Sequence, residues 1–352
     1  MSVHGVPAAE AIERLERFDA IVDARSEAEY AEDHLPGAVN WPSLDNGQRH
    51  EIGTLYKQVS PFEANKRGAA LIAANDARHI EQHVIDKPRQ WQPLVYCWRG
   101  GKRSGSLAHI LGQIGFRVSV LEGGYKAFRT AVLGALPALA ARLDYRVICG
   151  PTGSGKTRLL HALEAAGAQV LDLEGLASHR SSVLGLVPGQ PQPTQKAFDT
   201  LVWDKLRRFD PARPVFVESE SRKVGNVAVP EALIERMRAS ACVDLQLSDD
   251  ERVKLLLEDY DFFVRDPRLF CERLDALTQL RGRAVVQAWQ EDVAAGRIEN
   301  VVRELLVKHY DPGYAASIKR NFVRSGAALR VAPGDRSMPA MARVAADLAR
   351  SA

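Results

Sequence analysis

Cysteine is scarce in this chain of 352 residues. The four cysteines lie far apart, and no two of them form a Cys-x-x-Cys pair. This pattern argues against a disulfide framework and against a zinc site, and it indicates a reducing, cytoplasmic environment in which a thiol can stay reactive. The four are Cys97, Cys149, Cys242 and Cys271.

Long hydrophobic runs are also missing. The most apolar stretch, residues 131–141, is too short to span a bilayer and contains Gly134 and Pro137. Residues 1–10 lack a basic flank followed by an apolar core, so we expect no signal peptide and no membrane partner. The net charge is only +3, which permits contact with nucleic acid without arguing for it, because such binding depends on local clustering.

A glycine-rich stretch stands out in the middle of the chain. Residues 150–157 read GPTGSGKT and fit the P-loop pattern G-x-x-x-x-G-K-[ST]. A short strand is predicted before it, over 145–149, and a helix after it, over 158–166, which is the context that the pattern requires. Backbone N–H groups and the lysine of such a loop bind a di- or triphosphate. The predicted phosphate-binding residues are Gly150, Gly153, Ser154, Gly155, Lys156 and Thr157.

Three acidic residues follow predicted strands near this loop. Asp172 and Glu174 stand at the polar end of a strand over 168–174, and Glu218 ends a strand over 213–218. They can support a metal or act as acid or base, but a solvated carboxylate is an equally good interpretation of Glu218, and we assign no metal ligand. Since no catalytic-base signature of a fast NTPase is recognisable, the loop indicates phosphate binding more than ATP hydrolysis.

A basic loop surrounds Cys97. A buried strand over 93–96 delivers this cysteine to a Gly-rich loop, residues 98–103, and a helix is predicted from Ser104. The loop N–H groups, the helix N-terminus and three cations favour negative charge at the sulfur, so we predict a nucleophilic thiolate. The other cysteines lack such surroundings. The predicted catalytic residues are Cys97, Arg99, Lys102 and Arg103.

The first part of the chain resembles the rhodanese family. The segments that carry the resemblance are DARS at 23–26, HLPGAVN at 34–40, the Cys97 loop and LEGGY at 121–125. That family carries sulfur or selenium on the loop cysteine. The spacing Cys97-x5-Arg103-Ser104 also satisfies the pattern of cysteine phosphatases, whose loop holds a tetrahedral anion, and the spacing alone leaves both interpretations open.

Strands that alternate with short helices predict an α/β fold for both halves of the chain. We expect a rhodanese-like α/β domain followed by a P-loop NTPase-like α/β domain with a helical C-terminal extension. The predicted boundaries are 1–136 for the first domain, 137–143 for a helical connector, 144–248 for the P-loop core and 249–352 for the helical extension and the C-terminal part of the P-loop domain.

The fusion of these two domains is similar to the bacterial tRNA 2-selenouridine synthases. Four further segments look like that family's own sequence, and the resemblance covers nearly the whole chain. They are GTLYKQVSPFEA at 53–64, YCWRGG at 96–101, ESES at 218–221 and HYDP at 309–312. The interval from Cys97 to Arg103 is normal in that family, which weakens the phosphatase interpretation.

The resemblance implies a tRNA-modifying transferase that replaces the sulfur of wobble 2-thiouridine with selenium. Geranyl diphosphate would first alkylate the sulfur, and selenophosphate would then donate selenium, with Cys97 receiving it. The P-loop residues Gly153, Gly155, Lys156 and Thr157 would serve geranylation. The expected partners are the tRNA anticodon loop and a supplier of selenophosphate; we expect a cytoplasmic monomer without a tightly bound cofactor, with Mg²⁺ as an optional ion.

Two other functions fit the same motifs. One is a rhodanese-regulated kinase or NTPase that acts on a small molecule, and the other is a cysteine phosphatase whose P-loop only binds. A separate signal lies in residues 308–321, where aromatic and basic residues alternate. That mixture suits stacking and phosphate contact with single-stranded RNA, but a helix cap with core tyrosines fits it equally well.

Overall fold

The computed structural model describes residues 3–180, 185 and 189–351. The chain forms two compact units, the first made of 1–135 with 194–204 and the second of 136–193 with 205–352. Each unit is built on a five-stranded sheet in which all neighbouring strands run parallel. The predicted succession of two α/β folds is therefore confirmed. The sequence did not predict that residues 194–204 belong to the first unit.

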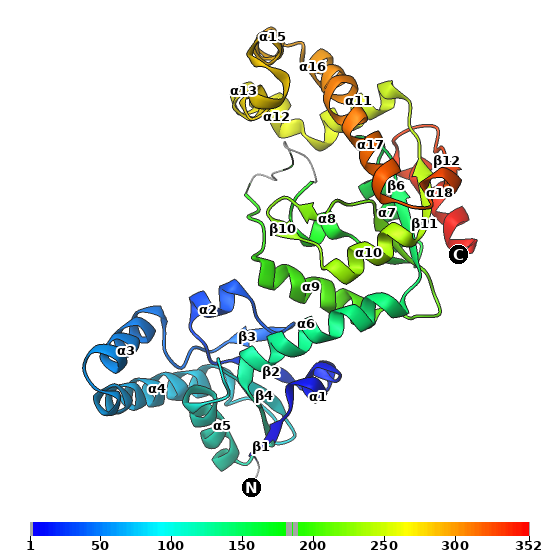
Figure 1. The fold of residues 1–352 in the computed structure, drawn as a ribbon. Coiled ribbons are helices and arrows are strands. Elements are labelled where there is room, and N and C mark those ends of the chain that lie inside the picture. The colour runs from blue at the N-terminus through cyan, green and yellow to red at the C-terminus, as the bar shows by residue number, and fades with distance from the viewer. Residues whose placement is uncertain (1–2, 181–184, 186–188, 352) are drawn as a thin grey trace. The chain divides into compact units, whose positions relative to one another are not determined.

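The sheet of the first unit has the strand order β1-β5-β4-β2-β3 (Figure 1). Its strands are β1 (Val3–Val6), β2 (Ala20–Asp23), β3 (Ala38–Asn40), β4 (Pro93–Tyr96) and β5 (Val118–Leu121). The helical segments are α1 (Ala8–Ile12), η1 (Leu15–Arg17), α2 (Glu27–Glu32), α3 (Asn46–Gln58), α4 (Pro61–His83), α5 (Lys102–Ile114) and α6 (Gly124–Arg142). All four residues of the central strand β4 are buried, as expected for a parallel strand that is covered on both faces.

The sheet of the second unit has the order β12-β11-β6-β8-β7. Its strands are β6 (Tyr145–Cys149), β7 (Gln169–Leu171), β8 (Val215–Glu218), β11 (Ala241–Leu245) and β12 (Leu329–Val331), and β9 (Lys223–Val224) with β10 (Val227–Ala228) forms a separate antiparallel pair. The core helices are α7 (Lys156–Ala165), α8 (Leu173–Leu176), α10 (Glu231–Ala239) and α18 (Met338–Arg350), whereas α9 (Gln195–Arg208) begins in the segment 194–204 of the first unit. Leu159, Leu163, Met341 and Ala345 share one buried apolar cluster, which joins α7 to α18.

The predicted helical extension occupies the segment between β11 and β12 (yellow and orange in Figure 1). Its own apolar core contains Phe270, Leu274, Trp289 and Val301. Its elements are α11 (Asp249–Asp259), α12 (Asp261–Arg265), α13 (Pro267–Asp275), α14 (Thr278–Arg281), α15 (Arg283–Ala294), α16 (Ile298–Leu305), η2 (Leu306–Tyr310), α17 (Asp311–Asn321) and η3 (Ser325–Ala327). The extension therefore folds around a core of its own and returns the chain to the sheet at β12.

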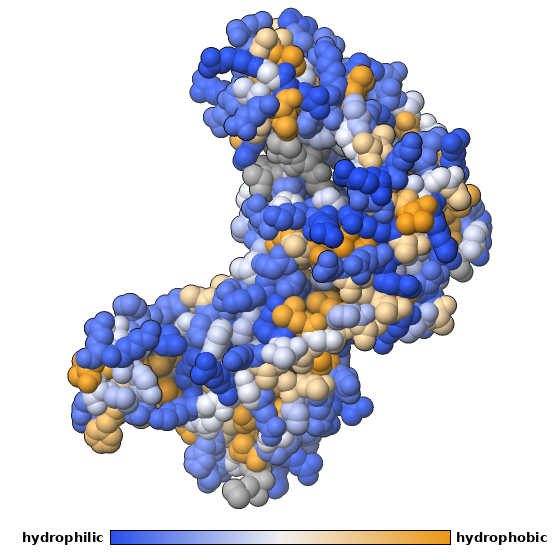
Figure 2. All heavy atoms as spheres, viewed as in Figure 1, coloured by the Kyte–Doolittle hydropathy of each residue, from blue (hydrophilic) through white to orange (hydrophobic). Residues whose placement is uncertain are grey.

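Figure 2 shows hydrophilic residues over most of the face in view, with hydrophobic residues in small groups between them. Among the described residues, no helix has the length and apolar character that a bilayer crossing requires.

One buried acid in the first unit is expected to make the stability of the protein depend on pH. Asp76 is fully buried on α4, where Ser43 Oγ donates to its Oδ1 at 2.9 Å. Burial raises the pKa of Asp76 from 3.8 to about 6, although hydrogen bonds from Ser43 and Ser106 act in the opposite direction. Because the folded pKa is raised, the free energy of unfolding falls as the pH rises from 3.8 to about 6. At pH values above that range, the pKa shift lowers the free energy of unfolding by about 3 kcal/mol.

We therefore expect Asp76→Asn to stabilise the protein above neutral pH, by up to about 3 kcal/mol, and to give a smaller gain in acid. The asparagine keeps a carbonyl oxygen for Ser43 but carries no charge. Urea unfolding at pH 8 and at pH 5 measures the difference. An equal gain at the two pH values would show that Asp76 does not change its ionisation across this range.

Candidate functional site

The cysteine loop lies at the carboxyl end of β4. Cys97 is 3% exposed, and its Sγ accepts hydrogen bonds of 3.2 Å from the N–H of Gly101 and of 3.2 Å from Ser104 Oγ. Burial alone would raise the pKa of this thiol. The hydrogen bonds from the Ser104 hydroxyl and amide, the charge of Arg103 and the N–H of Gly101 outweigh burial, so the pKa of Cys97 is lowered. The predicted thiolate thus has a structural basis.

The helix after the loop begins earlier than the sequence predicted. α5 starts at Lys102 with Gly101 as its N-cap, so Lys102 and Arg103 belong to the first helical turn and not to the loop. A glycine pair before two good helix formers lets the helix start there, with the cap provided by Gly101. The expected start at Ser104 is therefore wrong by two residues.

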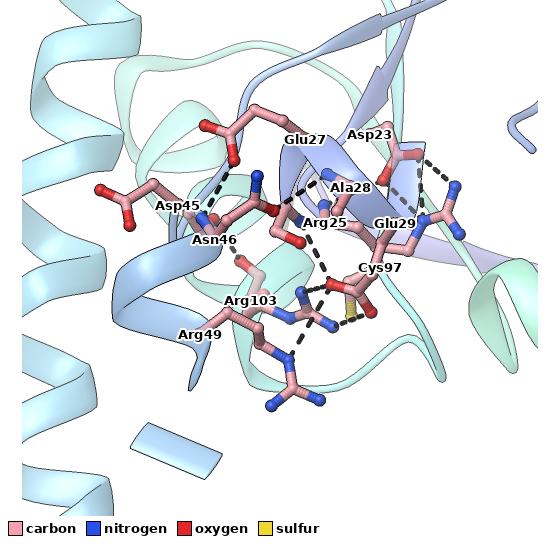
Figure 3. Close-up of polar contacts among 12 residues, drawn as sticks. Asp23, Arg25, Glu27, Ala28, Glu29, Asp45, Asn46, Arg49, Cys97 and Arg103 are labelled. Atoms are coloured by element: carbon pink, nitrogen blue, oxygen red, sulfur yellow. Dashed lines mark hydrogen bonds and ion pairs between the residues drawn. The ribbon is translucent and has the colours of Figure 1, made fainter. Parts of the chain in front are cut away.

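The three predicted cations have different surroundings. Arg103 Nη1 donates to Glu29 Oε2 at 2.7 Å, and Arg49 lies 3.9 Å from the same oxygen, so Glu29 stands between two arginines (Figure 3). Lys102 Nζ donates to Asn65 Oδ1 at 2.8 Å. Arg99 is exposed at the loop. Arg103 acts on Cys97 through its charge and makes its hydrogen bonds to Glu29.

The LEGGY segment forms the wall of the cysteine loop. The N–H of Tyr125 donates to the carbonyl of Cys97 at 2.8 Å, and that of Lys126 donates to the carbonyl of Trp98 at 3.1 Å. Gly124 has φ +58, and a Cβ there would lie 2.2 Å from the carbonyl oxygen of Cys97. A side chain at this position would push the two loops apart, which explains why glycine occupies it.

The P-loop has the geometry that its pattern predicts. It connects β6 to α7, and Lys156 Nζ donates to the carbonyl of Gly150 at 2.9 Å. Gly155 has φ +89, and a Cβ there would meet Met341 of α18 at 2.6 Å. Ser154 is fully buried, and its hydroxyl has no hydrogen-bond partner within the described part of the chain. The predicted residues Gly150 and Gly153 belong to the same loop, and Thr157 lies in the first turn of α7.

The helical extension holds this loop through an arginine that the sequence did not single out. Arg252 of α11 is 4% exposed, and its Nε and Nη2 donate to the carbonyl of Thr152 at 3.0 and 2.9 Å. Asp311, at the start of α17, accepts from Arg252 Nη1 at 3.1 Å and also from Nη2. Charge-assisted bonds of this kind fix geometry firmly. The HYDP segment supplies this aspartate, so the extension shapes the phosphate loop.

Tyr314 of α17 closes the loop from the other side. The N–H of Gly150 donates to its hydroxyl, which also lies 3.4 Å from Ser219 Oγ. Lys156 Nζ is 5.6 Å from the centre of its ring. Burial raises the pKa of this tyrosine above its ordinary value. The segment in which the sequence indicated either RNA contact or core tyrosines thus places Tyr310 and Tyr314 in the wall of the phosphate cavity.

The three predicted acids lie together beside the loop, in a different way from the one expected. β7 ends at Leu171, and Asp172 is the N-cap of α8, where it accepts from the N–H of Gly175 at 2.7 Å. Glu174 is therefore helical, and it accepts from Thr157 Oγ1 at 3.3 Å. The expected strand to residue 174 is wrong because the aspartate caps a helix instead.

Glu218 is buried, so its interpretation as a solvated carboxylate is wrong. It is 2% exposed, its Oε1 accepts from the N–H of Glu174 at 2.7 Å, and its Oε2 has no partner among the described residues. Burial, followed by the charges of Asp172, Glu174 and Glu220, raises the pKa of Glu218 well above its ordinary value. An acid of this kind fits proton transfer better than surface solvation. No described cluster of His, Cys, Asp or Glu has the geometry of a metal site.

A cavity of about 960 Å³ opens over the P-loop. Its walls combine cationic and polar side chains with aromatic ones, among them Lys156, Arg158, Arg180, Tyr260, His309 and Tyr314. A second, apolar cleft of about 50 Å³ shares Thr152, Leu256, Tyr260 and Tyr310 with it and continues between α11, α12, α13 and α16. The cavity over the phosphate loop therefore borders a small apolar cleft.

Comparison with known proteins decides the family. The family model described as "tRNA 2-selenouridine synthase AAA domain" matches residues 143–267, and the model of the rhodanese-like domain matches residues 7–131. A tRNA 2-selenouridine synthase of Cupriavidus necator is 34% identical over 329 residues, which cover 84% of this chain and 87% of that protein. The chain belongs to the tRNA 2-selenouridine synthase family.

Other members show the same extent of similarity. The synthase of Cupriavidus pinatubonensis is 33% identical over 86% of this chain and 90% of its own length, and that of Verminephrobacter eiseniae is 34% identical over 84% and 88%. The two family models include Cys97, Lys156 and Arg252 but end before Asp311 and Tyr314. Asp311 and Tyr314 thus lie beyond the matched domain, and the sequence signalled them through the HYDP segment and through the aromatic and basic residues of 308–321.

Proposed function

We propose that this protein converts 2-thiouridine at the wobble position of tRNA into 2-selenouridine. In the first step geranyl diphosphate alkylates the thiocarbonyl sulfur, and in the second step selenium from selenophosphate displaces the geranylated sulfur. A thiocarbonyl sulfur leaves poorly, whereas a thioether sulfur on the same carbon leaves more readily. The observation that carries the proposal is that a member of this family has two separate loops whose donors and cations suit an anion, one built around Lys156 and one around Cys97.

The P-loop supports the use of a diphosphate ester, geranyl diphosphate, as the alkyl donor. Lys156 and the loop N–H groups would bind the diphosphate and stabilise its charge as it departs, which is the way such loops act on nucleotides. The apolar cleft that adjoins the cavity at Leu256 and Tyr260 offers a place for the end of a hydrocarbon chain.

Mg²⁺ fits the same site. Thr157 Oγ1 and the carboxylate of Glu174 lie together at the end of the loop, and Mg²⁺ in phosphate sites is commonly held by one or two protein oxygens together with the substrate phosphates. These two residues would hold the ion, which would neutralise charge on the diphosphate. Glu218, whose raised pKa keeps it neutral over a wider range, would move or hold a proton beside them.

Reconstitution with purified components tests the function. The protein is incubated with tRNA that carries 2-thiouridine, first with geranyl diphosphate and then with selenophosphate, and the nucleosides are analysed by mass spectrometry. We expect S-geranyl-2-thiouridine after the first addition and 2-selenouridine after the second. If neither nucleoside forms, or if ATP is consumed at a rate typical of kinases without RNA, the proposal is wrong.

A further inference from the structure

The electron balance of the selenation step restricts the reactions in which Cys97 can take part. Selenium has the same oxidation level in selenophosphate and in the selenocarbonyl of the product, so the overall exchange needs neither an oxidant nor a reductant. If the Cys97 sulfur attacked selenium, the electrons of the P–Se bond would stay on phosphorus, and phosphite would leave. A reductant would then be required to release selenium from the S–Se bond. Attack on phosphorus avoids both requirements.

We propose that Cys97 accepts the phosphoryl group of selenophosphate, and not its selenium, during the selenation step. The sulfur attacks phosphorus, the S–P bond forms and the P–Se bond breaks. Selenium leaves with both electrons of that bond as hydrogenselenide, which attacks C2 of the alkylated base and displaces the geranyl thiolate. Water then hydrolyses the S–P bond, which releases phosphate and restores the Cys97 thiolate. This inference rests on the proposed function and specifies the chemistry of its second step.

The loop around Cys97 offers hydrogen-bond donors for a tetrahedral anion. Within the described part of the chain, the N–H groups of Trp98, Arg99 and Gly100 donate no hydrogen bond to a protein acceptor, while the carbonyls of Cys97 and Trp98 are taken by the LEGGY wall. Three consecutive N–H groups without a described protein acceptor, in the loop that leads into the 13-residue helix α5, can serve as an anion cradle. The exposed Arg99 adds a cation at its edge. A phosphoryl group with three oxygens can accept from all of these donors at once, which a single selenium atom does less well.

Ser104 is placed to assist the second half of the cycle, the hydrolysis of the S–P bond. Its Oγ lies 3.2 Å from Cys97 Sγ, and it is fully buried on the first turn of α5. Hydrolysis of the S–P bond expels Cys97 as a thiolate, so a hydroxyl that donates to the sulfur stabilises the leaving group. Ser104 therefore acts as a positioning residue for hydrolysis, and its loss makes the phosphorylated protein last longer.

Two isotopic labels on the donor test the proposal. The wild-type protein with geranylated tRNA is mixed with selenophosphate that is labelled in phosphorus or, separately, in selenium, and the reaction is quenched within a single turnover. We expect the phosphorus label on the peptide that contains Cys97 and no selenium label there. In Ser104→Ala, hydrolysis slows about tenfold or more, and the labelled fraction of the protein rises.

The controls separate this inference from the proposed function. Cys97→Ser takes up no label, while Cys271→Ser, which changes the half-buried cysteine of the second unit, is labelled like the wild type. Three results would overturn the inference alone. They are a selenium label on Cys97, phosphite as the phosphorus product, and the formation of 2-selenouridine while neither the wild type nor Ser104→Ala carries either label. If the wild type forms no 2-selenouridine, the proposed function has failed instead.

Discussion

Cys97→Ser is expected to lower the rate of selenation by about a thousandfold or more and to leave geranylation of the same tRNA at the wild-type rate. The loop lowers the pKa of the thiol through Ser104 and Gly101, but a serine hydroxyl at the same place stays protonated and is a far weaker nucleophile. Single-turnover assays, with 2-thiouridine tRNA for the first step and pre-geranylated tRNA for the second, measure the two rates separately.

The matched control for this variant is Cys271→Ser, because that cysteine lies in the helical extension with its thiol pKa raised by burial. We expect wild-type rates for both steps. If Cys97→Ser slowed geranylation as much as selenation, the two loops would not divide the reaction between them. Circular dichroism of each variant confirms that a lost rate does not reflect a lost fold.

Lys156→Ala is expected to show the opposite pattern, with geranylation reduced about a hundredfold to a thousandfold and selenation of pre-geranylated tRNA unchanged. The ammonium group lies at the P-loop, 2.9 Å from the carbonyl of Gly150, and is placed to stabilise the charge that develops on the departing diphosphate. The rate of release of pyrophosphate from geranyl diphosphate measures the effect.

Lys205→Ala serves as the control for the lysine, because Lys205 is a partly exposed residue of the same unit that forms an ion pair with Glu164, at 3.5 Å. It is expected to behave like the wild type in both steps. A loss of selenation in Lys156→Ala on pre-geranylated tRNA would contradict the assignment of the P-loop to the alkyl donor.

The sequence predicted those parts of the site that consist of contiguous residues. The P-loop, its strand and its helix follow from one octapeptide, and the strand before Cys97 follows from a short apolar run, because local sequence determines both. The start of α5 at Lys102 was missed, since a glycine cap leaves no distinctive side chain in the sequence. The change from strand to helix at Asp172 was missed because a cap depends on the backbone angles that the next turn adopts.

The parts that were not predicted depend on contacts between distant segments. Arg252 and Asp311 are 59 residues apart and meet at the carbonyl of Thr152, which no spacing rule anticipates. The burial of Glu218 follows from the packing around β8, and its raised pKa follows from that burial and from the nearby carboxylates. A single sequence supplies composition and periodicity but not the pairing of segments that are far apart.

The dependence of the P-loop on Arg252, Asp311, Tyr314 and α18 has a consequence for the order in which the protein matures. Synthesis on the ribosome produces GPTGSGKT long before it produces these partners. The first unit has all its residues once residue 204 has emerged, whereas the phosphate loop still lacks its clamp and the helix against Gly155. A nascent chain therefore acquires its reactive thiol first and its phosphate site last.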